Sequence, residues 1–285
     1  MVFNFAHSRF YRIRLALEAY DPPPGWRAWV WEFLLFGFKQ GWACLFGALM
    51  LGLILVTRYV WQADWPLARY DFLFAAALSI QCTLLLLRME TLAEAKVILI
   101  FHVVGTCMEL FKTQMGSWTY PEAAVMRLGG VPLFSGFMYA AVGSYIARIT
   151  RIFDMRYSNY PPLWQSGALA GSIYTNFFAH HFVTDMRTAI YLVTGVIWGR
   201  CWVYFKPHRA WRRMPLLVGF GLVAFFIWLA ENIGTFAAAW YYPNQAKGWQ
   251  LVPIAKFGAW YLLMIISFVL VSFVHRPQPP EPEAR

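Results

Sequence analysis

The chain reads ELFKTQMGSWTYP over residues 109–121 and ENIGTFAAAWYYP over residues 231–243. Glu, Thr, Trp, Tyr and Pro coincide in register, and each copy leads into a loop, a Val-Pro step and another apolar run. This match predicts a duplicated fold. It also places two carboxylates, Glu109 and Glu231, near the ends of membrane-length helices, where ionisable side chains are costly and usually functional.

The composition indicates an integral membrane protein. The chain is 60% hydrophobic and only 13% charged, which is far from the average of soluble domains. Several apolar stretches reach the ~20 residues that a helix needs to cross the hydrocarbon core. We therefore predict an all-α, polytopic transmembrane helical bundle of about eight spans. The spans are 40–57, 69–88, 96–114, 129–148, 161–178, 188–205, 215–239 and 251–274.

The distribution of Lys and Arg predicts the orientation of these spans. Sixteen of the 24 basic residues fall in segments that lie on one side of the membrane, which is therefore the cytoplasmic side. Both termini of this multi-pass protein are then predicted to face the cytoplasm. The same distribution accounts for the net charge of +10, because basic inner loops meet anionic lipid. We expect no nucleic-acid partner.

The direction of the spans predicts how the chain is divided. Spans three and seven both run outward, so residues 40–148 and 161–274 form two four-helix halves of the same topology within one transmembrane domain, 40–274. A pseudo-twofold axis would then lie along the membrane normal. Residues 1–39 are predicted to form a cytoplasmic or interfacial segment, and residues 275–285 a disordered cytoplasmic tail.

Four residues on these helices are candidates for catalysis. Glu109 and Glu231 are a matched pair of acids. His102 precedes Glu109 by seven residues, which places both on one helix face, and Lys112 follows Glu109 by three and is within pairing distance. The alternative is structural: glutamates that cap local polar groups and a histidine that packs through a hydrogen bond.

The aromatic residues after each glutamate are candidates for substrate binding. Trp118, Tyr120, Trp240 and Tyr242 would line a pocket, or would form the interfacial belt typical of membrane proteins. Asn232 lies beside Glu231, and Lys256 is placed to neutralise Glu231 or, less readily, to form a Schiff base.

A polar loop between spans five and six offers a metal site. His180, His181 and Asp185 lie at the same outer boundary as both glutamates, and imidazole with carboxylate suits a divalent metal ion. Asn176 and Arg187 flank them as candidates for substrate binding. The alternative is a solvated loop with an Asp185–Arg187 ion pair.

Several motifs resemble one bacterial family. They are FHVVGT (101–106), MELFK (108–112), GSWTYPE (116–122), GGVPLFSGFMYAAVGSY (129–145), NFFAHH (176–181) and DMR (185–187). Together they resemble the family of unknown function that includes the bacterial YoaT proteins, which implies a multi-pass inner-membrane protein and no established activity. The two Glu-to-Pro segments are more distantly similar to membrane carotenoid hydratases and lycopene cyclases, which protonate isoprenoid double bonds with intramembrane carboxylates.

Three functional hypotheses follow. The first is an enzyme that modifies a lipid or an isoprenoid at the outer leaflet, with Glu109 and Glu231 as acid and base, or with metal assistance from the histidines. The second is a proton-coupled transporter or permease of a small or amphipathic solute. The third is a scaffold in which the acids are structural. Membrane lipids and a hydrophobic or amphipathic small molecule are the expected partners, and the cofactor is unknown, a divalent metal ion being one candidate.

Overall fold

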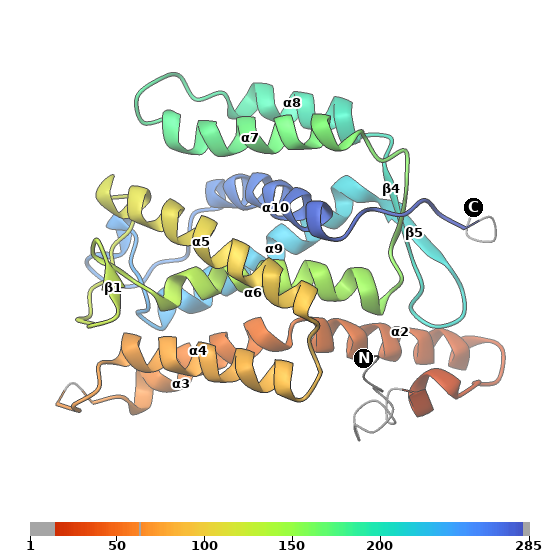
Figure 1. The fold of residues 1–285 in the computed structure, drawn as a ribbon, viewed down its shortest axis with the longest axis horizontal. Coiled ribbons are helices and arrows are strands. Elements are labelled where there is room, and N and C mark those ends of the chain that lie inside the picture. The colour runs from red at the N-terminus through yellow and green to blue at the C-terminus, as the bar shows by residue number, and fades with distance from the viewer. Residues whose placement is uncertain (1–14, 63, 282–285) are drawn as a thin grey trace.

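The computed structural model describes residues 15–62 and 64–281 and is predominantly helical (Figure 1). The main helices are α2 (Trp26–Ala43), α3 (Leu45–Val60), α4 (Arg69–Leu86), α5 (Leu92–Gln114), α6 (Phe134–Ile152), α7 (Leu163–Ala179), α8 (Arg187–Trp198), α9 (Leu216–Phe236) and α10 (Ala255–Val274). Helices α5, α6, α9 and α10 form the centre of the bundle, with α7 and α8 on one side and α2, α3 and α4 on the other. A helical bundle is thus confirmed.

Short strands mark the two ends of the bundle (Figure 1). At one end β1 (Arg127–Leu128) and β2 (Val131–Pro132) form a hairpin. Its two-residue turn uses Gly129 (φ +52°) and Gly130 (φ +88°), the positive values that a tight hairpin turn of this length favours. At the opposite end, β3 (Arg156–Ser158), β4 (Trp202–Phe205) and β5 (Arg212–Pro215) form an antiparallel sheet in the order β3-β4-β5.

Several helices suit a membrane by length and composition. Within the described residues, α4, α9 and α10 are long and apolar enough to cross a bilayer individually, and α2 with α3 would make a fourth span as a pair bent by 67°. Large apolar side chains are exposed on the outside of the bundle, such as Leu86 at 82% and Val196 at 85%. This chain is therefore a membrane protein, although eight spans are not confirmed.

The predicted sixth span, 188–205, is wrong as a single helix. Helix α8 ends at Trp198, and β4 begins at Trp202. Twelve residues of helix rise only ~18 Å, well short of the ~30 Å hydrocarbon core. The segment after Gly199 is apolar enough to resemble the continuation of a membrane helix, but residues Trp202–Phe205 form strand β4, which pairs with β3 and β5.

A helix precedes the first predicted span, and the chain after the last predicted span contacts strand β3. Helix α2 already begins at Trp26, and Cys44 separates it from α3, so the predicted span 40–57 is the second arm of a bent pair. The expectation for residues 1–14 lies outside the described residues. After α10 the chain contacts the segment 156–158: the Tyr157 amide donates to the Gln278 carbonyl (2.8 Å) and Arg156 pairs with Glu281 (3.3 Å).

Glycines let α5 and α6 approach closely. A Cβ at Gly105 would lie 2.6 Å from the Tyr139 ring, one at Gly136 would lie 2.5 Å from His102 Nδ1, and one at Gly143 would lie 2.7 Å from the Phe101 ring. Small residues at such contacts are the usual means of packing helices in lipid. This packing places the Tyr139 ring against Gly105 of α5, about one helical turn before Glu109.

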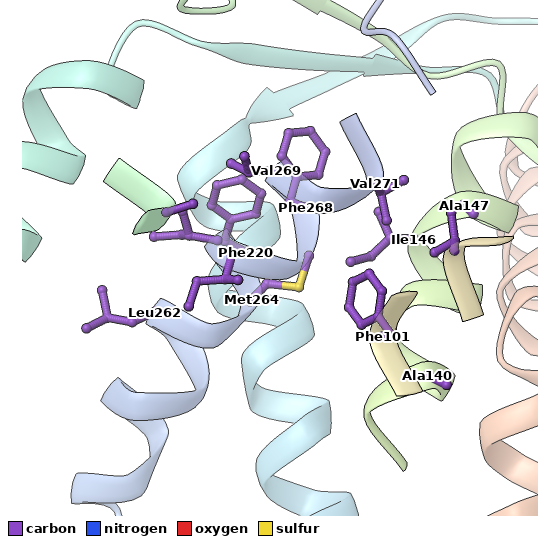
Figure 2. Packing of buried hydrophobic residues seen from close by; sticks show 14 of the residues in the cluster. Phe101, Ala140, Ile146, Ala147, Phe220, Leu262, Met264, Phe268, Val269 and Val271 are labelled. Atoms are coloured by element: carbon purple, nitrogen blue, oxygen red, sulfur yellow. The ribbon is translucent and has the colours of Figure 1, made fainter. Parts of the chain in front are cut away.

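The main apolar core joins the two central helix pairs. Figure 2 shows Phe101 from α5 and Ile146 from α6 facing Met264 and Val271 from α10. On the other side of α10, the rings of Phe220 and Phe268 lie 5.1 Å apart. The core therefore holds α5–α6 against α9–α10, the two pairs that carry the matched glutamates.

Candidate functional site

The Glu109 carboxylate is held by three neutral donors. Trp118 Nε1 (2.7 Å) and the Tyr120 hydroxyl (2.6 Å) donate to Oε2, and the Tyr139 hydroxyl donates to Oε1 (2.8 Å). Glu109 is buried, with 4% of its surface exposed. Both carboxylate oxygens are thus engaged by aromatic side chains.

The Glu231 carboxylate repeats the first two of these contacts. Trp240 Nε1 (2.8 Å) and the Tyr242 hydroxyl (2.6 Å) both donate to Oε1. Each glutamate therefore accepts hydrogen bonds from the residues nine and eleven positions after it. The six side chains thus form two groups of three with the same spacing in the sequence.

The local fold that returns Trp and Tyr to the glutamate is the same in both copies. Each helix ends in a left-handed residue, Gly116 (φ +67°) or Ala238 (φ +57°). The next amide then bonds back to the helix, from Ser117 to the Lys112 carbonyl (2.9 Å) and from Ala239 to the Gly234 carbonyl (3.0 Å). This is the Schellman cap, which reverses the chain at a helix end.

A backbone bridge joins the two copies directly. The Thr119 amide donates to the Tyr241 carbonyl and the Tyr241 amide to the Thr119 carbonyl, both at 2.9 Å. Each residue lies ten positions after its glutamate, so the bridge pairs equivalent positions. Trp118 and Tyr242, from opposite copies, are in edge-to-face contact at 6.1 Å.

One large cavity contains both carboxylates. Its volume is about 730 Å³, and its lining includes Glu109, Tyr139 and Glu231 at one end. It continues along α6 and α9 to Met155, Val203 and Met214 near the β3-β4-β5 sheet. The lining between these ends is almost entirely apolar, so the cavity has one polar end and a long hydrophobic body.

The charged neighbours of the two glutamates differ from expectation. Among the described residues, neither glutamate forms an ion pair within 4.0 Å. Lys256 does not contact Glu231; its ammonium lies over the Tyr242 ring, 4.4 Å from the centroid, and 6.0 Å from that of Trp118. The carboxylates are thus stabilised by neutral donors.

The predicted pairing of Lys112 with Glu109 is wrong. The Lys112 ammonium points to the loop after α7, 2.9 Å from His181 Nε2 and 3.5 Å from His180 Nε2, and lies 4.2 Å from the centre of the Phe177 ring. His180 Nδ1 donates to the Asn176 carbonyl (3.0 Å), which leaves its Nε2 to accept from Lys112. Lys112 therefore belongs to a separate cluster.

The metal ligands predicted in this loop do not converge. Asp185 pairs with Arg187 and accepts from the Asn176 amide (3.1 Å), which is the alternative weighed for this loop. The Nε2 atoms of both histidines face an ammonium, and the residues that the structure describes hold no group of three or more His, Cys, Asp or Glu arranged to bind a metal. We carry no metal into the function.

Two further candidates have packing roles. The His102 ring lies 4.5 Å from that of Phe137 and against Gly136, at the α5–α6 contact rather than at the cavity. Asn232 donates to the Trp228 carbonyl and accepts from the Val252 amide, both at 2.8 Å, so it fastens the loop before α10. Neither lines the cavity.

Sequence reasoning missed Tyr139 and Trp260, which line the cavity from α6 and α10. The signal was present: both lie eight residues after the valine of a Val-Pro step, at Val131 and Val252. The two side chains differ, Tyr in one copy and Trp in the other, so identity between the copies does not mark this position.

Fold and site together define a helical membrane protein with two aromatic-bound carboxylates in one apolar cavity. The chain belongs to the family described as "Protein of unknown function (DUF817)", whose model matches residues 32–268. It is 40% identical over 251 residues to the uncharacterized protein YoaT of Bacillus subtilis (strain 168), covering 88% of this chain and 94% of that protein.

Solved structures are similar at a lower level. Two crystal structures of MvINS, an Insig homolog from Mycobacterium vanbaalenii, one of them a cross-linked trimer, align with a TM-score of 0.48 and 12% identity. They cover 66% of this chain and 98% of that one. The resemblance to carotenoid hydratases and lycopene cyclases is not shown by these matches.

Proposed function

We propose that this protein is a membrane enzyme that modifies a lipid or an isoprenoid by acid–base chemistry. The observation that carries the proposal is the pair of carboxyl groups at the polar end of a 730 Å³ apolar cavity, neither of which has an ion-pair partner within 4.0 Å among the described residues. Buried carboxylates in membrane helices are normally paired with a cation. Their exposure to a cavity shaped for a hydrocarbon chain favours a catalytic purpose.

The shape of the cavity fits a long, narrow ligand. Its lining runs along α6 from Ser135 to Ile149 and along α9 from Glu231 to Leu216. Fourteen or fifteen helical residues rise ~20 Å, which is most of the hydrocarbon thickness. A lipid acyl chain or an isoprenoid would fill this length.

The chemistry needs no reactant beyond the substrate. A proton from one glutamic acid adds to a carbon of a C=C bond, whose π electrons form the new C–H bond and leave a cation on the neighbouring carbon. The other glutamate removes a proton from an adjacent carbon, and that C–H electron pair forms the shifted double bond. Positioned acids and bases of this kind contribute ~10²–10⁴-fold in rate.

The aromatic rings suit the cationic intermediate. Trp118, Tyr120, Trp240 and Tyr242 surround the two carboxylates and line the cavity. The Lys256 ammonium over Tyr242 (4.4 Å) is an example of a cation at one of these ring faces. In our proposal the same faces stabilise the positive charge that develops on the substrate.

The proposal also includes a duplicated fold and a defined orientation of the chain in the membrane. Two halves of the same topology, with both termini in the cytoplasm of a bacterial inner membrane, place both glutamates at the outer leaflet. The matched caps and the Thr119–Tyr241 bridge support a local twofold relation between the helix pairs α5–α6 and α9–α10.

One observation favours a second candidate, a proton-coupled transporter. The cavity reaches from the glutamates to the sheet at the other end of the bundle, so a solute could pass along it, with the two acids as a proton relay.

Comparative lipidomics tests the enzyme against the transporter. In a deletion strain we expect one lipid to accumulate and a product to disappear. The wild-type gene should restore the profile, whereas Glu109→Gln and Glu231→Gln should not. Glu281→Gln is the matched control and should restore it, since Glu281 lies at the far end of the bundle and pairs there with Arg156. An unchanged lipid profile, together with proton-coupled flux in proteoliposomes that both Gln variants abolish, would favour the transporter.

A further inference from the structure

The two carboxylates are not equivalent towards the cavity. Glu109 accepts hydrogen bonds on both oxygens. Glu231 accepts both of its hydrogen bonds on Oε1, and its Oε2 receives none from the described residues. Since Glu231 lines the cavity, one carboxylate oxygen is left open to a ligand.

The residue that makes this difference is on α10. Tyr139 on α6 donates to Glu109, and the residue in the equivalent place after the second Val-Pro step is Trp260. The Trp260 Nε1 is buried and has no hydrogen-bond partner among the described residues. A buried N–H without a partner costs ~1–3 kcal/mol, so this donor is expected to have a partner in the working protein.

We propose that Glu231 Oε2 and Trp260 Nε1 bind the hydroxyl group of a long-chain or isoprenoid alcohol, whose hydrocarbon tail fills the apolar cavity. A hydroxyl donates and accepts at the same time, so one group satisfies both the open carboxylate oxygen and the indole N–H. This alcohol would be the substrate class of the proposed enzyme, so its role as a substrate rests on the proposed function. Binding of the alcohol can be measured without turnover.

Other polar head groups fit this site less well. A phosphate or a carboxylate would meet the Glu109 and Glu231 carboxyl groups at the same end of the cavity, and like charges in an apolar setting repel strongly. An ammonium group has no acceptor for the Trp260 N–H. A neutral hydroxyl meets neither objection.

The test compares two probes of the same carbon skeleton. Farnesol carries the hydroxyl and farnesene does not, and the dissociation constant of each is obtained from ligand-dependent thermal stability of the full chain in nanodiscs. We expect the wild type to bind farnesol about tenfold more tightly than farnesene, since one or two hydrogen bonds are gained. Equal affinity for the two probes would overturn the proposal.

Two variants assign the preference to Trp260. Trp260→Phe removes the indole N–H. Trp260→Tyr introduces a hydroxyl like that of Tyr139, which donates to Glu109 in the first copy. Both should reduce the preference for farnesol over farnesene about three- to tenfold. The control is Trp164→Phe, since Trp164 is 71% exposed on α7, and it should behave as the wild type.

The outcomes separate this inference from the proposed function. If both Trp260 variants keep the preference for farnesol, or if their affinities for farnesol and farnesene fall by the same factor, the proposed hydroxyl site is wrong. If the preference is found but Glu109→Gln and Glu231→Gln restore the lipid profile of the deletion strain, the site exists and the acid–base function is wrong.

Discussion

Buried carboxylates are stabilised in two different ways in this protein. Glu90 forms an ion pair with Arg148 (2.8 Å) in which both side chains are 0% exposed, and it also accepts from Ser144 and Gln81. Glu109 and Glu231 have only neutral donors. A carboxyl group without an ion-pair partner can gain or lose a proton without leaving a buried cation unpaired. In our proposal the two modes therefore correspond to a structural and a chemical use of the same residue type.

This contrast predicts that the same substitution destabilises the protein by very different amounts at the two kinds of site. Glu90→Gln leaves the Arg148 guanidinium buried without its counter-ion, which should cost about 3–5 kcal/mol and lower the midpoint of thermal unfolding by roughly 10 °C. Glu231→Gln keeps an oxygen for Trp240 and Tyr242 and should cost less than about 1 kcal/mol. Thermal unfolding in detergent measures both, and similar losses from the two variants would contradict the distinction.

The His181 side chain should make stability depend on pH. Burial and the nearby Lys112 ammonium lower the pKa of His181 below its ordinary value of 6.5. The unfolded chain then takes up the proton first, so stability should be lost as the pH falls from about 6.5 toward the lower pKa of the folded state. His181→Gln should show a smaller fall in unfolding midpoint between about pH 7.5 and 5.5 than the wild type. His208→Gln, at the other end of the bundle, is the control and should keep the wild-type response.

At the scale of elements, the two helix-to-loop reversals position the site. Helices α5 and α9 each end in a left-handed residue, and the chain folds back so that an indole and a phenol reach the last turn of the helix. Gly234 is part of this arrangement in the second copy, because a Cβ there would lie 2.3 Å from the Trp240 ring.

Gly234→Ala should therefore displace Trp240 and weaken its hydrogen bond to Glu231. We expect a loss of about 1–3 kcal/mol from overpacking, measured as a lower unfolding midpoint, with a shift in tryptophan fluorescence. Gly195→Ala is the matched control, since no atom lies within 4 Å of its added Cβ, and alanine is favoured in a helix by up to ~1 kcal/mol. Equal behaviour of the two variants would show that Gly234 does not shape the site.

Most helices could be predicted from the sequence, and the exceptions have physical reasons. Continuous apolar runs predicted α4, α9 and α10 to within a few residues. Strand β4 was taken for helix because an apolar strand and an apolar helix have the same hydropathy, and only pairing with β3 and β5 distinguishes them.

The candidate site was predicted in part. The repeated pattern identified Glu109, Glu231 and their Trp and Tyr donors. It could not show that Lys112 turns to the histidines instead of to Glu109, because both partners are within reach of the same helix end and only the packing of α7 decides between them. Tyr139 and Trp260 come from other helices, so local spacing around the glutamates does not reveal them.

At the scale of the molecule, the two helix pairs enclose one site. The Thr119–Tyr241 bridge, the Trp118–Tyr242 contact and the shared cavity place both glutamates in a single compartment. Glu109 is the more fully hydrogen-bonded of the two, whereas Glu231, which also lines the cavity, has one carboxylate oxygen without a hydrogen-bond partner among the described residues.

The central claim is that these two carboxyl groups exchange protons with carbon atoms of a bound lipid. The most direct measurement is deuterium incorporation: purified protein is incubated in D₂O with lipids extracted from a deletion strain, and carbon-bound deuterium is followed by mass spectrometry. We predict incorporation by the wild type and a loss of about 100-fold or more in Glu109→Gln and in Glu231→Gln. No incorporation by the wild type, or wild-type incorporation by either variant, would contradict the claim.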